Sequence, residues 1–189
     1  MRIPGDGIDL RLPTSADRER WFELIHDPEE LRFGLPAFVP VPETVESLDS
    51  RVADAAEAYA ARAPGSFAIV DPADPDRFLG IISWRLDAHA ALRIVDIGYG
   101  VHADSRGRGV ARRAIRTFVR WLSTDVDGPR MVRVQLDHSV ENIASCRVAL
   151  AAGLEIEGVR PGFLPLRDPT APDGVRRHDV CLHGVVVPD

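Results

Sequence analysis

The sequence predicts an α/β (α+β) fold: one domain over residues 1–189, with a mixed β-sheet that has helices on both faces. Length and composition are the first indication, because 189 residues, 45% hydrophobic and 28% charged, suit one globular domain with a sizeable core. The second is a strand–loop–helix–strand unit over residues 94–136, which implies a crossover between parallel strands. The third is a set of further strand candidates on either side of that unit.

The first sixty residues predict one short strand and two helices. Residues 8–12 alternate like a strand, and the hydroxyl and acidic residues of Thr14-Ser15-Ala16-Asp17 resemble a helix start. This helix is expected to end near Asp27-Pro28. A loop rich in Gly and Pro follows at 34–42, and helical spacing of apolar residues predicts a second helix over 45–61.

The rest of the chain predicts six more strands and two more helices. Residues 66–70 and 78–86 are expected to be strands joined by an acidic turn, and residues 92–101 form the next strand. A helix follows the loop at 106–111, a strand covers 131–136, and the helix from Asn142 to Ala152 ends at Gly153. Residues 154–159 and 176–187 close the sheet. The Pro- and Gly-rich stretch between them, 161–174, is predicted to be a mobile loop.

The loop Arg106-Gly107-Arg108-Gly109-Val110-Ala111 is the most informative segment. It ends a strand and begins a helix, where first-turn N–H groups lack intrahelical partners and face anions. Gly107 and Gly109 allow unusual backbone angles and close approach of a ligand. Arg106 and Arg108 add guanidinium charge suited to phosphate. The loop therefore predicts a site for a phosphorylated small molecule.

Composition excludes several classes of function. The net charge of −6 argues against a nucleic-acid partner, and all 23 basic residues are Arg, which excludes Schiff-base lysine chemistry. No apolar run is long enough to span a membrane, and the N-terminus lacks a signal-peptide pattern. Cys146 and Cys181 predict no disulfide framework. His102, His138 and His178 show no metal-ligand pattern, so no metal is expected. The two reduced thiols, with no signal peptide or membrane span, predict a cytoplasmic location.

Ordered motifs across the chain resemble those of the GNAT N-acetyltransferase family. Its acetyl-CoA signature, Arg/Gln-x-x-Gly-x-Gly/Ala, matches Arg106, Gly109 and Ala111. The branch that includes the RimJ/RimL enzymes, which acetylate N-termini of ribosomal proteins, is the most similar. Further motifs of that branch occur here in the same order: Asp96-Ile97-Gly98-Tyr99, Asn142-Ile143-Ala144-Ser145, Ala152-Gly153-Leu154, Glu157-Gly158 and Arg177-His178-Asp179.

The resemblance implies a seven-stranded, mostly antiparallel sheet with a splayed parallel pair and about four helices. Acetyl-CoA is the implied co-substrate, with pantetheine on backbone near Val101 and Ala103 and the pyrophosphate on residues 106–111, namely Arg106, Gly107, Arg108, Gly109, Val110 and Ala111. Asn142 and Ser145 are expected to hold the far side of the cofactor arm. A primary amine attacks the thioester directly, and a backbone N–H near Val101 stabilises the oxyanion.

Two positions depart from the wider family. Many members carry a Tyr, the acid for the departing thiolate, seven residues after the Asn; here that position is Ala149, and Ser145 is the predicted substitute. Asp96 stands where relatives usually have Glu. Its carboxylate is the candidate base, acting through water, but it is one methylene shorter and also suits a structural role.

The sequence leaves several alternatives open. The acceptor is a protein N-terminus or a small-molecule amine, because the loops that select it vary most. Ala149 and Asp96 keep open a catalytically silent acyl-CoA sensor of the same fold. Eight arginines between Arg106 and Arg133 also suggest an RNA-binding face, against which the net charge argues. Relatives often form homodimers, and the oligomeric state is not fixed by the sequence.

Overall fold

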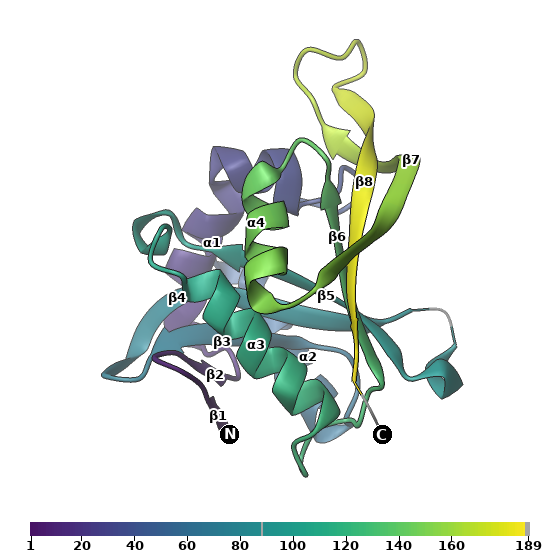
Figure 1. Cartoon of the computed structure of the whole chain (residues 1–189). Helices are drawn as coiled ribbons and strands as arrows, with labels where there is room; N and C mark the ends of the chain where they lie inside the picture. Colours follow the sequence, from purple (N-terminus) through teal and green to yellow (C-terminus); the bar gives the residue numbers. More distant parts are fainter. Residues whose placement is uncertain (88, 188–189) are drawn as a thin grey trace.

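A computed structural model describes residues 1–87 and 89–187 (Figure 1), so residues 88, 188 and 189 of the expected domain lie outside the described residues. The strands are β1 (Arg2–Pro4), β2 (Asp9–Arg11), β3 (Ser66–Asp71), β4 (Asp74–Leu86), β5 (Ile94–Val101), β6 (Arg133–Ser139), β7 (Glu155–Arg167) and β8 (Val175–Val186). The α-helices are α1 (Arg18–His26), α2 (Asp49–Ala60), α3 (Val110–Ser123) and α4 (Ile143–Ala152). Short helical turns include the π-helical turn η2 (Glu30–Gly34) and the 3-10 turn η5 (Ala103–Ser105).

The eight described strands form one mixed sheet in the order β1-β2-β3-β4-β5-β6-β8-β7. Neighbouring strands are antiparallel except β5 and β6, which are parallel as the crossover unit predicts. Because α3 connects these two strands, the helix begins at the end of β5 and packs back across the sheet (Figure 1).

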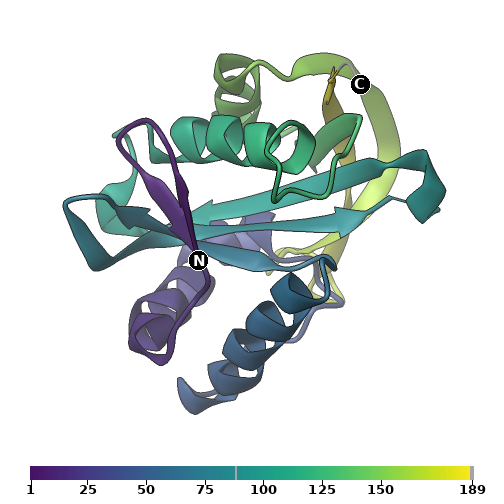
Figure 2. The same cartoon turned by 90° about the horizontal axis from the view of Figure 1, so that it is seen from below.

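Helices cover both faces of the sheet, as Figure 2 shows: α1 and α2 lie on one face, α3 and α4 on the other. The larger core lies under α3, where Ile115, Phe118 and Leu122 are fully buried against Phe67 and other sheet residues. The smaller core lies under α1 and contains Trp21 and neighbouring apolar residues. The alternation of apolar residues along β3 and β4 supplies both cores at once.

Most predicted elements are confirmed. The acidic residue of the first helix start acts as expected, since the Thr14 N–H donates to Asp17 Oδ2 at 2.7 Å. Gly153 ends α4 with φ +99°, the left-handed conformation that glycine favours at this position. The fold class is therefore confirmed: a mixed, mostly antiparallel sheet with a parallel pair and helices on both faces.

Two expectations were wrong. Within residues 1–87 and 89–187 the sheet has eight strands rather than seven, because Arg2–Pro4 pairs with Asp9–Arg11 in a strand too short to show a periodic pattern. The stretch 161–174 is not one long loop: β7 continues to Arg167, and its pairing with β8 resumes at Leu164↔His178 after an irregularity. That irregularity accommodates Pro161 and Gly162, because a bulge tolerates residues that regular pairing excludes.

Candidate active site

The central feature of the site is a splay between β5 and β6. The two strands pair at Ile94↔Arg133, Val95↔Val134 and Asp96↔Gln135, and the described pairing stops there. Beyond Asp96, β5 stays on β4 and β6 stays on β8, so the two halves of the sheet separate at this seam.

The splay leaves one edge of β5 exposed to a ligand. Asp87 N–H donates to Ile94 O at 3.1 Å and His102 N–H to Leu79 O at 2.9 Å, so even-numbered residues of β5 bond to β4. The opposite edge carries the backbone N–H and C=O groups of Ile97, Tyr99 and Val101. An extended ligand arm can therefore pair with this edge as an added strand would.

A cleft of about 590 Å³ occupies the splay. It is lined by the end of β5, the loop before α3, the end of β6, the start of α4 and the turn η2. Eight predicted site residues line it: Val101, Arg106, Gly107, Gly109, Val110, Ala111, Asn142 and Ser145. The other three, Asp96, Ala103 and Arg108, are not among its lining residues.

The loop before α3 has the geometry of an anion cradle. Gly107 and Gly109 both have φ +72°, so the prediction of unusual backbone angles is confirmed. Gly109 caps α3, and its carbonyl accepts the Arg113 N–H at 3.2 Å. The N–H groups of Val110 and Ala111 precede that bond and point along the positive end of the helix dipole. We name residues 107–111 the amide cradle.

Arg106 links the loop to the end of β5 and to Asp27, which follows α1. Its Nε donates to Val101 O at 3.0 Å, and its Nη2 donates to Asp27 Oδ1 at 2.7 Å. Glu29 is a weaker third partner, at 3.3 Å. These bonds tie β5, the residues after α1 and the loop together, and the contact of Arg106 with a phosphate stays a prediction.

A pair of hydroxyl groups lines the cleft where the start of α4 meets β5. Asn142 caps the helix, its Oδ1 accepting the Ser145 N–H at 3.0 Å, so its predicted capping role is confirmed. The Ser145 hydroxyl then lies 3.0 Å from the hydroxyl of Tyr99 on β5. Burial raises the pKa of Tyr99, which keeps its proton in place. Ala149, at the position where many relatives carry Tyr, is fully buried, and Tyr99 supplies a phenol beside Ser145 instead.

Glu30 is a functional candidate that the sequence interpretation missed. It begins η2 and lies over Gly100 of β5, where a Cβ in place of the glycine hydrogen would come within 3.1 Å of Glu30 Oε2. Burial raises the Glu30 pKa to about 7, although the nearby Arg106 charge opposes the shift. A carboxylate with a pKa near neutrality, at the edge of a cleft, is suited to accept a proton. The π-helical turn is a signal of function that only the structure reveals.

Glu30 and the Tyr99–Ser145 pair lie on opposite faces of β5. The Tyr99 side chain packs against the core under α3 and α4. At Gly100, the next residue, a side chain would point to the opposite face, which η2 covers. The splay joins these two faces. Two substrates can therefore approach the same opening from opposite sides of the sheet.

Asp96 lies at the closed end of the splay. Its carboxylate accepts the Gln135 amide N–H at 3.0 Å, and the same amide donates to Asp87 at 3.0 Å. Burial raises the Asp96 pKa, against the opposing charge of Arg85. This geometry is suited to fixing the last parallel pair, and the catalytic role of Asp96 stays a prediction.

Next to the cleft, the loop at 34–42 is held by β7; of these two segments, Gly34 is the residue that lines the cleft. Arg167 of β7 donates to four carbonyls of the 34–42 loop, including Val39 O at 2.6 Å, and Ala37 N–H donates to Pro165 O at 2.9 Å. Leu35 packs against the smaller core, whereas Phe38 is 72% exposed. The Arg177-His178-Asp179 motif fixes the β7 irregularity, since Gly162 N–H donates to Asp179 Oδ1 at 2.8 Å.

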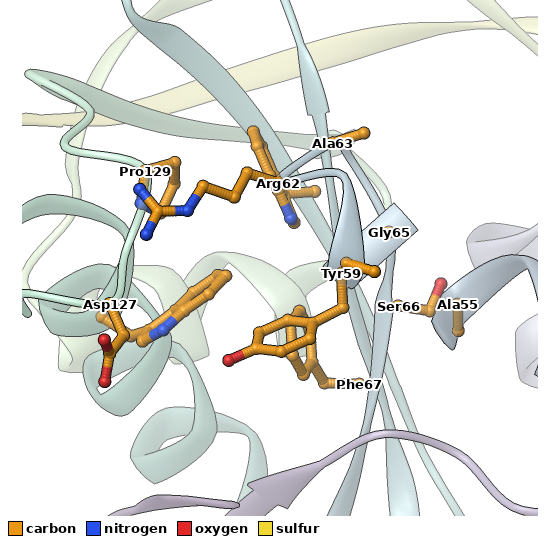
Figure 3. Close-up of a pocket in the computed structure, with 12 residues that line it drawn as sticks. Ala55, Tyr59, Arg62, Ala63, Gly65, Ser66, Phe67, Asp127 and Pro129 are labelled. Carbon is orange, nitrogen blue, oxygen red and sulfur yellow. The ribbon is translucent and has the colours of Figure 1, made fainter. Parts of the chain in front are cut away.

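A second pocket, of about 190 Å³, lies between the end of α2 and the end of α3 (Figure 3). Tyr59 and Arg62 extend toward the loop that carries Asp127 and Pro129. Trp121 lines this pocket, and Val110 lines the cleft. These residues are eleven positions apart on α3, about 16 Å along the axis. The second pocket is thus separate from the amide cradle.

Comparison with known proteins gives the class of this fold and site. The family model described as "Acetyltransferase (GNAT) domain" matches residues 8–155. The chain therefore belongs to the GNAT acetyltransferase family. No curated protein matches its sequence significantly.

Three similar solved structures define the fold further. Ribosomal-protein-S5-alanine acetyltransferase from Vibrio fischeri is 18% identical with a TM-score of 0.80, over 100% of this chain and 98% of that one. RimJ from Mycobacterium smegmatis, in complex with CoA-disulfide, is 21% identical with a TM-score of 0.79, over 98% and 86%. The microcin C7 self-immunity acetyltransferase MccE, bound to acetyl-CoA and AMP, is 21% identical with a TM-score of 0.71, over 96% and 93%.

Within residues 1–87 and 89–187, no helix combines the length and the apolar composition needed to span a membrane.

Proposed function

We propose that this protein transfers the acetyl group of acetyl-CoA to a primary amine, by direct attack within a ternary complex. The observation that carries the proposal is the position of Glu30 over the exposed edge of β5, across from the hydroxyl pair of Tyr99 and Ser145. A base on one side and a proton donor on the other match the two proton transfers that the reaction requires.

The cofactor would occupy the side of the cleft beneath α3 and α4. Its diphosphate would accept hydrogen bonds from the amide cradle, where two glycines leave room for close approach. Its pantetheine arm would pair with the odd-numbered residues of β5, and the N–H of Val101 would face the thioester oxygen. The complexes of RimJ with CoA-disulfide and of MccE with acetyl-CoA support this choice of cofactor.

The reaction begins when Glu30 takes a proton from the ammonium form of the acceptor. The neutral nitrogen attacks the thioester carbonyl, forming a C–N bond, and collapse of the tetrahedral intermediate breaks the C–S bond. The second amine proton passes to solvent water, and Glu30 also releases its proton to solvent, so that one proton is released overall after the thiolate is protonated. The Tyr99–Ser145 pair protonates the departing sulfur and is reprotonated from solvent.

The acceptor we favour is the α-amino group of a polypeptide. An α-ammonium group has a pKa of about 8 and a lysine side chain a pKa of about 10.4. Proton transfer to a base with a pKa of about 7 therefore costs much less free energy from the α-ammonium group than from lysine. Glu29, Glu30, Asp137 and Glu141 also line the cleft, and their carboxylates attract a cationic acceptor. The ribosomal-protein acetyltransferase among the similar structures points the same way.

A thiol-release assay with matched peptides tests the proposal. One set has an unblocked N-terminus and no lysine; the other has an acetylated N-terminus and one lysine. Turnover on the first set and none on the second is expected. If acetyl-CoA binds but no peptide or small amine supports thiol release, the protein is a sensor of acyl-CoA and the proposed function is wrong.

A further inference from the structure

Outside the proposed reaction, three buried side chains of β6 and β8 form a compact cluster: His138, Cys181 and His183. The strands pair His138 with Cys181 and Leu136 with His183, which directs all three toward the core side under α4. They are 5%, 7% and 0% exposed. One donor atom from each lies within 4.8 Å of the other two.

Each imidazole ring has a backbone carbonyl near Nδ1. His138 Nδ1 lies 2.8 Å from Ser139 O, and His183 Nδ1 lies 3.4 Å from Leu154 O. A carbonyl oxygen only accepts, so these contacts favour the tautomer with the hydrogen on Nδ1. In that tautomer both Nε2 atoms present lone pairs, and these two atoms are 3.1 Å apart. Two lone pairs at this distance repel each other unless a proton or a metal ion lies between them.

Two of the three donor–donor distances match those of a tetrahedral zinc site, and the third, between His138 Nε2 and Cys181 Sγ, lies within 4.8 Å. Zn–N bonds of about 2.0–2.1 Å and a Zn–S bond of about 2.3 Å give N···N near 3.3 Å and N···S near 3.6 Å. The measured values are 3.1 Å between the two Nε2 atoms and 3.5 Å between Cys181 Sγ and His183 Nε2. Hydrogen bonds from Nδ1 to carbonyls are the usual outer support of metal-bound histidines.

We propose that His138, Cys181 and His183 bind a zinc ion. Two imidazole nitrogens and a thiolate favour this ion over Ca²⁺ or Mg²⁺, which prefer oxygen ligands. His138 also lines the cleft, and a water molecule from that side would supply the fourth ligand. The linear spacing of the three residues predicts no such site, because strand pairing across 45 positions creates it.

The ion would brace the half of the sheet that the splay leaves unsupported. Beyond the last parallel pair, β6 is held by β8 rather than by β5. An ion coordinated by both β6 and β8 ties these strands together just where the cleft wall depends on them. It acts as a structural ion of the cleft, independent of whether acetyl transfer occurs.

The test uses the full chain, stripped of metal by a chelator and then titrated with Zn²⁺ or Co²⁺ alone. One Zn²⁺ per chain is expected, measured by competition with a chromophoric chelator. Co²⁺ should give the intense visible bands of tetrahedral coordination and a thiolate charge-transfer band. Cys181→Ser should lose that charge-transfer band and weaken Zn²⁺ binding by more than the roughly 10- to 100-fold typical of losing an outer hydrogen-bond partner.

Cys146→Ser is the matched control, because it removes the other cysteine of the chain and should keep the band. Folding is followed separately: Zn²⁺ at about 100 times its Kd should raise the melting temperature of the wild type by roughly 5–10 °C and that of His183→Gln far less. Absence of stoichiometric binding, or a charge-transfer band that survives Cys181→Ser, would overturn the proposal.

Discussion

The two sides of the cleft are built in different ways. The proposed cofactor side relies mainly on backbone: the exposed edge of β5 and the amide cradle, both within residues 94–111. The proposed acceptor side relies on side chains brought together from far apart in the sequence, including Glu30, Asp137 and Glu141. A backbone site serves one unchanging cofactor, whereas a side-chain site can be changed for each acceptor without disturbing it.

The largest expected effect falls on the acceptor side. Glu30→Gln removes the proposed base and should lower kcat/KM by about 10²–10⁴-fold, with the affinity for acetyl-CoA unchanged. The rise of wild-type kcat/KM through pH about 7 should disappear in the variant. Steady-state kinetics across pH, with the exposed Glu43→Gln as control, measure both. Equal losses in turnover and cofactor affinity would assign Glu30 to the cofactor side instead.

A change in the amide cradle should lower the affinity for acetyl-CoA, which Glu30→Gln is expected to leave unchanged. Gly109→Trp fills the approach to the N–H donors, and losing two charge-assisted hydrogen bonds should weaken acetyl-CoA binding at least about 100-fold. A non-glycine residue at φ +72° also costs about 1–2 kcal/mol of fold stability.

Gly174→Trp is the matched control for this strain, since Gly174 has the same φ of +72° in the turn before β8 and nothing within 4 Å. Calorimetric titration with acetyl-CoA compares the two variants. Similar affinities in both would remove the cradle from the cofactor site.

The Tyr99–Ser145 hydroxyl pair tests whether proton donation can be separated from cofactor binding. Ser145→Ala and Tyr99→Phe should each lower kcat by about tenfold, more than they lower cofactor affinity, and the double variant should be little worse than either. Ser123→Ala and Tyr59→Phe are the controls, because Ser123 is as buried as Ser145 and Tyr59 lines the second pocket. Fully additive losses in the double variant would mean that the two hydroxyls act separately.

The smallest effect is on stability. The Glu30 pKa of about 7 in the fold lies above its ordinary 4.5, so the native state binds a proton more tightly than the unfolded state. The free energy of unfolding should therefore fall as pH rises from about 4.5 to 7. Glu30→Gln removes this loss and should be about 1–2 kcal/mol more stable than wild type at pH 8, after allowance for screening in the cleft. Urea unfolding at pH 5 and pH 8 measures the gap, which should narrow to about a quarter at pH 5; a gap that is constant with pH would contradict the assignment.

The difference between the two sides also explains what the sequence predicts. The helix-start glycines and the Asn142 cap depend on neighbours within a few residues, so local patterns predict them. The strand of residues 161–167 was missed because Pro161 and Gly162 resemble a loop, and its pairing depends on β8.

Glu30 shows the same limit at the site. Nothing in its immediate sequence distinguishes it from Glu29; its raised pKa comes from burial against Gly100, seventy positions away. The sequence identifies Tyr99 as part of a motif. Its contact with Ser145, however, spans 46 positions and depends on how α4 packs.

A crystal structure with coenzyme A tests the central claim most directly. Its diphosphate oxygens should lie within hydrogen-bond distance of the N–H groups of residues 107–111, with the pantetheine along Ile97, Tyr99 and Val101. A diphosphate bound elsewhere, for instance at the second pocket beside Tyr59 and Trp121, would contradict the assignment of the cofactor side and the mechanism built on it.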